Sequence, residues 1–103
     1  MSFLEKFRKL KPWYTQARTP YHHFTIVAPV VIKEYINKLK ASPGKAHVDI
    51  NLWALDFDEA IEMVRAAAKT HGFIIDGKIK IYCTDPVKPP KEKPYIYSTT
   101  FTY

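Results

Sequence analysis

The fold prediction starts from residues 56–72, which read DFDEAIEMVRAAAKTHG. The Asp56 side chain can accept a hydrogen bond from a backbone N–H at the start of a helix, and Glu59 follows at the capping-box spacing. Gly72 then favours a left-handed helix end. Between these signals, apolar residues recur at three- and four-residue intervals: Phe57, Ala60, Ile61, Val64 and Ala68. We therefore predict a helix over residues 57–71.

Upstream of this helix, the sequence predicts two strands and a second helix. Residues 47–54 alternate between apolar and polar side chains, which is typical of a strand with one buried face. Residues 21–27 are aromatic and β-branched, and also favour a strand. From Pro29, which suits the first turn of a helix, apolar residues recur at helical spacing up to Leu39. We predict a helix over 29–41, although the β-branched run Val30, Val31 and Ile32 favours a strand instead.

Downstream of residue 72, the pattern predicts strands and one loop. Phe73–Ile75 leads into Asp76-Gly77, a strong two-residue hairpin signal. Ile79, Ile81 and Cys83 are then predicted to face inward. Residues 86–94 contain four prolines and four charged residues and predict a stiff, solvated loop. A last strand over 95–103 places alternate residues on one face: Tyr95, Tyr97, Thr99, Phe101 and Tyr103.

The N-terminal stretch predicts a short basic amphipathic helix over residues 3–11. Phe3, Leu4, Phe7 and Leu10 recur at helical spacing, and Pro12 ends the pattern. The complete prediction is an α+β fold in the order α-β-α-β-α-β-β. It has a mixed sheet of about four to five strands, a parallel β-α-β crossover and helices mainly on one face. We expect a single domain over 1–103, with the helix and connector in 1–20 and the α/β core in 21–103.

Composition places the chain among ordinary globular proteins. It has 103 residues, of which 47% are hydrophobic and 25% charged. Cys83 is the single cysteine, so no intramolecular disulfide can form, and we expect a reducing, cytoplasmic location. The longest uncharged run, residues 24–32, is too short for a transmembrane segment. The net charge of +6, concentrated in the first 18 residues, favours acidic partners.

The sequence contains no pattern that predicts a cofactor, a metal or a catalytic site. The three glycines are explained by turns and a helix end, and they lack the spacing of a phosphate-binding loop. The four histidines and one cysteine lack zinc-ligand spacing. His22 and His23 are adjacent and point to opposite faces of a strand, and Cys83 is predicted to be a buried apolar side chain. The acidic residues near Asp56 complement the helix dipole.

Two features exceed what the predicted fold requires, and each also has a packing explanation. The first is the basic N-terminal helix followed by Trp13 and Tyr14, which could bind a partner or a membrane surface, or simply dock on the domain. The second is the aromatic row of the last strand beside Lys88, Lys91 and Lys93, which could stack on nucleic-acid bases or fill a half-buried strand. The candidate partner-binding residues are Lys6, Arg8, Lys9, Trp13, Tyr14, Tyr95, Tyr97 and Tyr103.

The leading hypothesis is a non-enzymatic module that binds another protein through exposed aromatic residues and the basic N-terminal segment. The alternative is an RNA- or single-stranded-DNA-binding domain, for which the charge and the aromatic row are the ingredients. The third is a small enzyme built on His22, His23 or Cys83. The most informative observation is which of the aromatic rows is exposed in the folded chain, because both binding hypotheses need exposed aromatic side chains.

Overall fold

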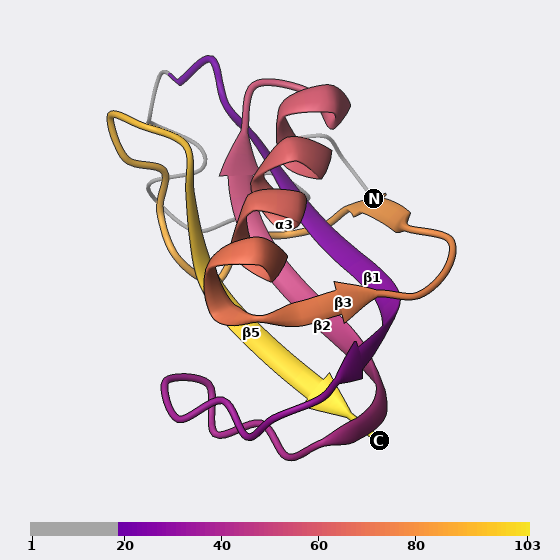
Figure 1. Ribbon diagram of the computed structural model, residues 1–103. Helices are drawn as coiled ribbons and strands as arrows, with labels where there is room; N and C mark the ends of the chain where they lie inside the picture. The colour runs from indigo at the N-terminus through magenta and orange to yellow at the C-terminus, as the bar shows by residue number, and fades with distance from the viewer. Residues whose placement is uncertain (1–18) are drawn as a thin grey trace, which may run out of the picture.

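The computed structural model describes residues 19–103. Within this range it has five strands and one helix, and the strands form one sheet that α3 crosses on a single face (Figure 1). In chain order the elements are β1 His22–Ile32, β2 Gly44–Ala54, α3 Phe57–His71, β3 Phe73–Ile75, β4 Lys80–Cys83 and β5 Tyr95–Thr102. The predicted N-terminal helix over 3–11 and most of its connector lie outside the described residues.

All strand pairs in this sheet are antiparallel. β1 and β2 form a long hairpin that pairs residues from His22 opposite Ala54 to Ile32 opposite Gly44. β5 pairs with the other side of β2, and β3 and β4 both pair with the other side of β1. The order across the sheet is β3-β1-β2-β5, with β4 on the same side of β1 as β3.

The predicted α-β-α-β-α-β-β order and mixed sheet are wrong. Residues 29–41 do not form a helix, because β1 continues to Ile32 and residues 33–43 form the loop that returns the chain into β2. The parallel β-α-β crossover is wrong for the same reason, since the two long strands are joined as a hairpin. The deciding signal is the two-residue period of the buried side chains, which runs unbroken along β1: Phe24, Ile26, Ala28, Val30 and Ile32.

Pro29 lies inside β1 because the neighbouring edge is interrupted there. A proline has no backbone N–H to donate to a sheet. Its carbonyl accepts a hydrogen bond from the Asp76 N–H (2.8 Å), so the side of β1 that lacks a donor faces the β3 and β4 edge. Residues 76–79 leave the sheet at this point, between β3 and β4. The predicted Asp76-Gly77 hairpin is therefore wrong, since β3 and β4 are successive parts of one edge.

Helix α3 confirms the prediction for residues 57–71. The Glu59 N–H donates to Oδ1 of Asp56 (2.8 Å), and Oε1 of Glu59 accepts from the Leu55 N–H (2.8 Å). Gly72 ends the helix with φ +90°, and its N–H donates to the Ala68 carbonyl. The buried side of α3 packs on the inward face of the sheet, where the core lies: Phe24, Ile26, Val30, Val48, Ile50, Leu52, Val64 and Phe73. No helix within residues 19–103 is long and apolar enough to cross a bilayer.

Candidate interaction surface

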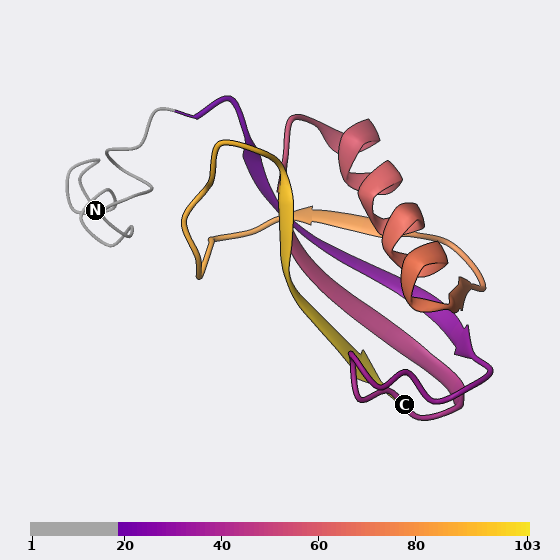
Figure 2. The same cartoon turned by 60° about the vertical axis from the view of Figure 1, so that its left-hand side comes forward.

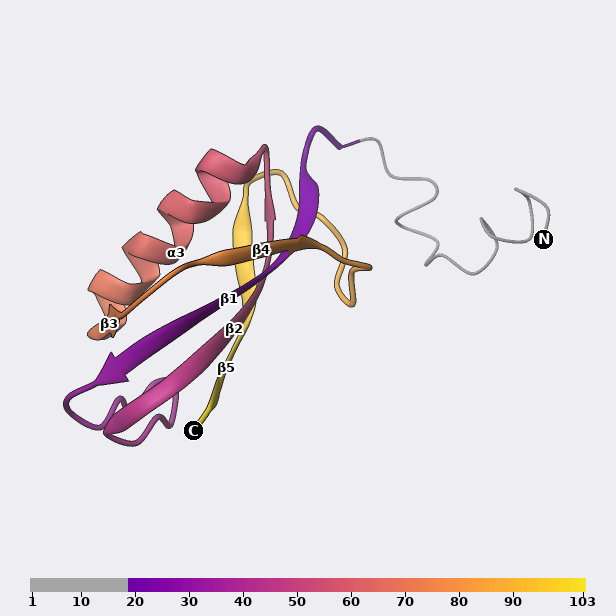
Figure 3. The ribbon, with the colours of Figure 1, turned by 90° about the vertical axis from the view of Figure 1, so that its right-hand side faces the viewer.

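The face of the sheet that points away from α3 carries apolar side chains along β1. Because side chains alternate along a strand, Val27, Pro29 and Val31 lie on the face opposite the core residues. Ile74 lies beside Val31 across the β1–β3 ladder, and Tyr82 lies beside Thr25 across the β1–β4 ladder. We call this set the open-face stripe: Val27, Pro29, Val31, Ile74 and Tyr82. Figure 3 shows α3 on one side of the sheet only.

The stripe is accessible in the described part of the chain. Ile74 is 47% exposed and Tyr82 is 50% exposed, and the three β1 residues are partly exposed. Lys80 lies opposite Val27 on the same face. The neighbouring β2 and β5 residues on this face are mostly polar: His47, Asp49, Asn51, Thr100 and Thr102. The open face therefore has an apolar half along β1 and a polar half along β2 and β5.

The beginning of β1 on this face is covered by the proline-rich loop, residues 84–94. Its carbonyls accept hydrogen bonds from Trp53 Nε1 (to Lys88, 2.9 Å), from Tyr21 Oη (to Glu92, 3.0 Å) and from Tyr95 Oη (to Pro89). The Lys91 ammonium group lies 4.4 Å from the centre of the Tyr95 ring. We call these anchoring side chains the aromatic clamp: Tyr21, Trp53, Tyr95 and Tyr97. The loop is thus attached to the sheet and is not merely a solvated connection as predicted.

A histidine-centred network lies beneath the clamp. Nδ1 of His23 lies 3.0 Å from the Thr84 carbonyl, which only accepts, so Nδ1 carries the proton. Nε2 is then the acceptor for Tyr97 Oη at 2.6 Å, and that hydroxyl accepts in turn from the Val87 N–H at 3.2 Å. His23 therefore has a defined neutral tautomer, and both of its ring nitrogens are engaged within the domain.

The network continues from the loop to the sheet through hydroxyl groups. The Thr25 hydroxyl donates to Oδ1 of Asn51 (2.6 Å) and lies 2.7 Å from the Thr84 hydroxyl. Because the Thr25 proton is directed at Asn51, the Thr84 hydroxyl donates to Thr25. These hydrogen bonds join β1, β2 and the 84–94 loop, and the His23–Tyr97 hydrogen bond adds β5.

Burial sets the protonation state of His23. The side chain is 5% exposed, and its ring packs edge-on against Trp53 (5.2 Å between centroids) and stacks with Tyr97 (5.5 Å). Loss of hydration lowers the pKa of His23 below its usual 6.5, against smaller opposing effects of the Thr84 hydrogen bond and the Asp85 charge. The neutral ring is thus the form that the folded domain favours.

The predicted aromatic row does not lie on one face, because β5 contains a bulge. Leu52 pairs with Ile96, whereas the preceding residue, Asn51, pairs with Ser98, so Tyr97 is an extra residue. The bulge reverses the alternation, so Tyr95 lies on the open face and Phe101 on the α3 face. Phe101 packs edge-on against Phe73 (5.4 Å).

The other candidate partner-binding residues divide into two groups. Tyr103 is 62% exposed, and its hydroxyl donates to the Ser42 carbonyl (2.7 Å), which ties the chain end to the 33–43 loop. Tyr95 and Tyr97 belong to the aromatic clamp. The remaining candidates lie outside the described residues: Lys6, Arg8, Lys9, Trp13 and Tyr14.

The residues considered for catalysis are partly brought together. Cys83 is exposed, and the prediction of a buried side chain is wrong because Cys83 ends β4 at the edge of the sheet. His22, His23 and Cys83 line one hollow of about 190 Å³, together with Asp85. Within residues 19–103 there is no group of three or more His, Cys, Asp or Glu side chains that could hold a metal ion.

Comparison of the chain with protein-family models, with curated proteins and with solved structures finds no match. The open-face stripe was not predicted, although the sequence carries a signal for it. Residues 24–32 are apolar at nearly every position, and such runs are typical of strands with two buried faces. Only one of those faces is covered by α3.

Proposed function

We propose that this chain is a non-enzymatic protein-binding domain and that the open-face stripe is its docking surface. The observation that carries the proposal is that β1 is apolar on both faces while α3 covers only one. In antiparallel sheets a solvent-facing surface is ordinarily polar. A contiguous exposed apolar patch with polar neighbours is typical of a protein interaction site, because a partner that covers it removes apolar area from water.

The geometry of the stripe supports binding without large rearrangement. β1 pairs on both sides, so the backbone under Val27 and Val31 is held in place before a partner arrives. A rigid surface loses little conformational entropy on binding. Tyr82 adds an aromatic ring with a polar end, a residue type that often dominates binding energy at interfaces. Lys80 supplies charge beside the apolar residues.

A photo-crosslinking amino acid at position 74 tests this proposal. The matched control places the same amino acid at Glu62, which is exposed on α3 on the opposite side of the sheet. In lysate, we expect position 74 to form a discrete protein adduct that excess unlabelled chain suppresses. Unlabelled Ile74→Lys protein should not suppress it, since a lysine would place a charge in the apolar contact. Identical adducts at both positions would contradict the proposal, and adducts removed by nuclease would favour the nucleic-acid alternative.

A further inference from the structure

Strand β5 is an edge strand of the sheet that residues 19–103 form. It pairs with β2 on one side, and within residues 19–103 it has no strand on the other. Figure 2 shows β5 as the outermost strand on that side of the sheet. Along such an edge, alternate residues direct backbone N–H and C=O groups outward, where another extended chain can pair with them.

The sequence of β5 contains few of the features that prevent pairing. It reads YIYSTTFT and has no charged residue and no proline. Natural sheet edges are commonly protected by lysine, proline or very short strands. The opposite edge illustrates this, because it is divided into β3 and β4, which have three and four residues, and carries Lys80. In β5 the bulge at Tyr97 is the one such device, and it leaves the run from Ser98 to Thr102 regular.

A groove of about 310 Å³ runs beside this edge on the α3 side of the sheet. Its apolar lining comes from Leu39 in the 33–43 loop, Ala67 on α3 and Ile96 on β5. The residues of β5 from Ile96 to Thr99 all line the groove. A strand added to β5 would direct every second side chain toward this groove. The groove therefore suits a small or medium apolar side chain of an added segment.

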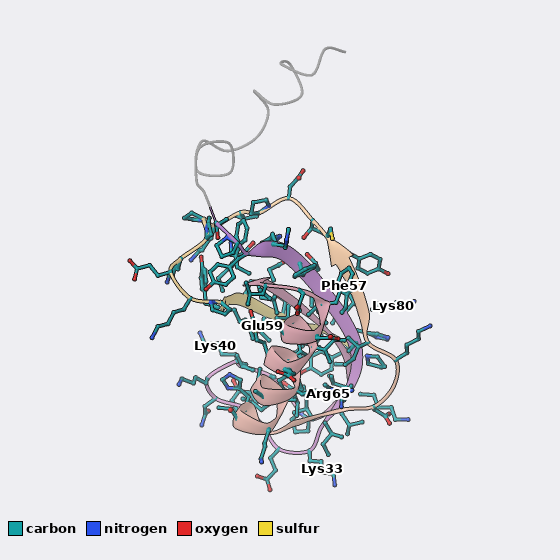
Figure 4. The ribbon with its side chains drawn as sticks, turned by 90° about the horizontal axis from the view of Figure 1, so that it is seen from above. Lys33, Lys40, Phe57, Glu59, Arg65 and Lys80 are labelled. Carbon is teal, nitrogen blue, oxygen red and sulfur yellow. The ribbon has the colours of Figure 1, made fainter. Side chains whose placement is uncertain are left out.

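The charged side chains at the groove indicate which peptide segments can pair with β5. Lys38 and His71 are the basic residues of the groove lining, which has no acidic side chain. In Figure 4 the neighbouring Lys40 lies on one side of α3, and Lys80 lies on the other. A second copy of this chain is a poor occupant, because β5 offers no acidic side chain to Lys38 and the chain carries a net charge of +6. An acidic side chain in the added strand would complement the groove.

We infer that β5 binds an extended, acidic peptide segment of another protein by strand addition, with apolar and acidic side chains alternating into the groove beside Leu39 and Lys38. This site is separate from the open-face stripe. It lies at the β5 edge on the α3 side of the sheet, whereas the stripe lies along β1 on the opposite face. Peptide binding to β5 and crosslinking at position 74 can therefore each fail without the other.

The test uses a labelled synthetic peptide of about eight residues. Every second residue is Thr, and the residues between them are Val and Glu in turn. Fluorescence anisotropy measures its binding to the full chain. Two further peptides carry N-methyl groups, one at the Thr positions and the other at the Val and Glu positions. Because only alternate N–H groups face β5, one methylated peptide should bind at least about tenfold more weakly and the other nearly normally. The inference would be overturned if the two methylated peptides bound equally well, or if the parent peptide did not bind at about 1 mM.

A charge exchange tests the groove. Lys38→Glu should weaken binding of the Glu peptide and strengthen binding of the same peptide with Lys in place of Glu. Lys33→Glu, an exposed change in the same loop, is the matched control and should leave both affinities within about twofold. Equal effects of the two substitutions would overturn the placement in the groove. If the chain self-associates and the peptide does not dissociate the copies, the β5 edge binds a second copy of the chain. This result would also overturn the inference.

Discussion

Nε2 of His23 accepts a hydrogen bond from Tyr97 Oη at 2.6 Å, although the two residues are 74 positions apart in the sequence. His23 lies near the start of β1 and Tyr97 at the bulge of β5, and β2 separates these strands in the sheet. The bulge supplies the extra residue whose hydroxyl reaches across β2. This hydrogen bond therefore connects β1 to β5 across β2, and the Val87 N–H connects the same hydroxyl to the loop that covers these strands.

Substitution Tyr97→Phe tests the contribution of this connection to stability. It removes the donor for His23 Nε2 and the acceptor for the Val87 N–H while keeping the ring. We expect a loss of about 1–3 kcal/mol in the free energy of unfolding, because a buried nitrogen is left without a partner. Urea denaturation measures this loss. Tyr82→Phe, on a half-exposed side chain, is the control and should change stability by less than about 0.5 kcal/mol. Equal losses for the two variants would show that the connection adds little.

The burial of His23 also predicts a pH dependence. Its pKa in the folded chain lies below the usual 6.5, so the unfolded chain binds the proton more readily. The stabilising contribution is therefore present above pH 6.5 and is lost as the pH falls below that value toward the folded pKa. Unfolding free energies between about pH 7.5 and pH 5 measure the slope. His23→Gln should reduce this slope relative to the unsubstituted chain. An unchanged slope in the His23 variant would contradict the prediction.

Gly77 is expected to tolerate no side chain, because a Cβ atom there would lie 2.6 Å from Cγ of Pro29. Gly77→Ala should cost about 1–3 kcal/mol in the free energy of unfolding by crowding this contact. In a Pro29→Ala background the same change should cost less, which a double-mutant cycle measures. Gly72→Ala is the control, since nothing lies near its Cβ position and Pro29→Ala should not alter its cost. Equal costs of Gly77→Ala in both backgrounds would show that Pro29 is not the cause.

Deletion tests the role of the N-terminal segment. Deletion of residues 1–11 should leave residues 19–103 folded, because the sheet and α3 form a core from their own side chains. We expect the thermal midpoint to change little and capture of the position-74 crosslinking partner to weaken, since the deletion removes part of the positive charge. A truncated chain that fails to fold would show that these residues belong to the core.

The local signals in the sequence predicted α3 correctly. The capping hydrogen bonds of Asp56, Glu59 and Gly72 reach residues at most one helical turn away, so they do not depend on the rest of the fold. The prediction of a helix over residues 29–41 is wrong because apolar residues there fit a helical spacing by coincidence: Val31, Ile32, Tyr35, Ile36 and Leu39. Pro29 strengthened that interpretation as a first-turn residue. Its place inside a strand depends on the interruption between β3 and β4, more than forty residues away, which no local pattern indicates.

The candidate surfaces were predictable only in part. The two-sided apolar character of residues 24–32 is visible in the sequence, but the face that stays open depends on where α3 packs. The engagement of Tyr95 and Tyr97 by the 84–94 loop depends on long-range hydrogen bonds with no sequence signature. The bulge at Tyr97 reverses every later side chain of β5, and a strictly alternating prediction places those residues on the wrong faces.

The proposed function requires that the open-face stripe is uncovered in the isolated chain. Isoleucine-methyl NMR with a soluble paramagnetic agent measures this exposure. In the full chain, the Ile74 methyl signal should broaden strongly, because that side chain is 47% exposed. The Ile50 methyl signal should stay sharp, because Ile50 is fully buried under α3. Broadening of the Ile74 signal with a sharp Ile50 signal is the result that a free docking surface predicts. If the Ile74 signal is as protected as that of Ile50, the chain covers its own open face and the proposed docking surface is contradicted.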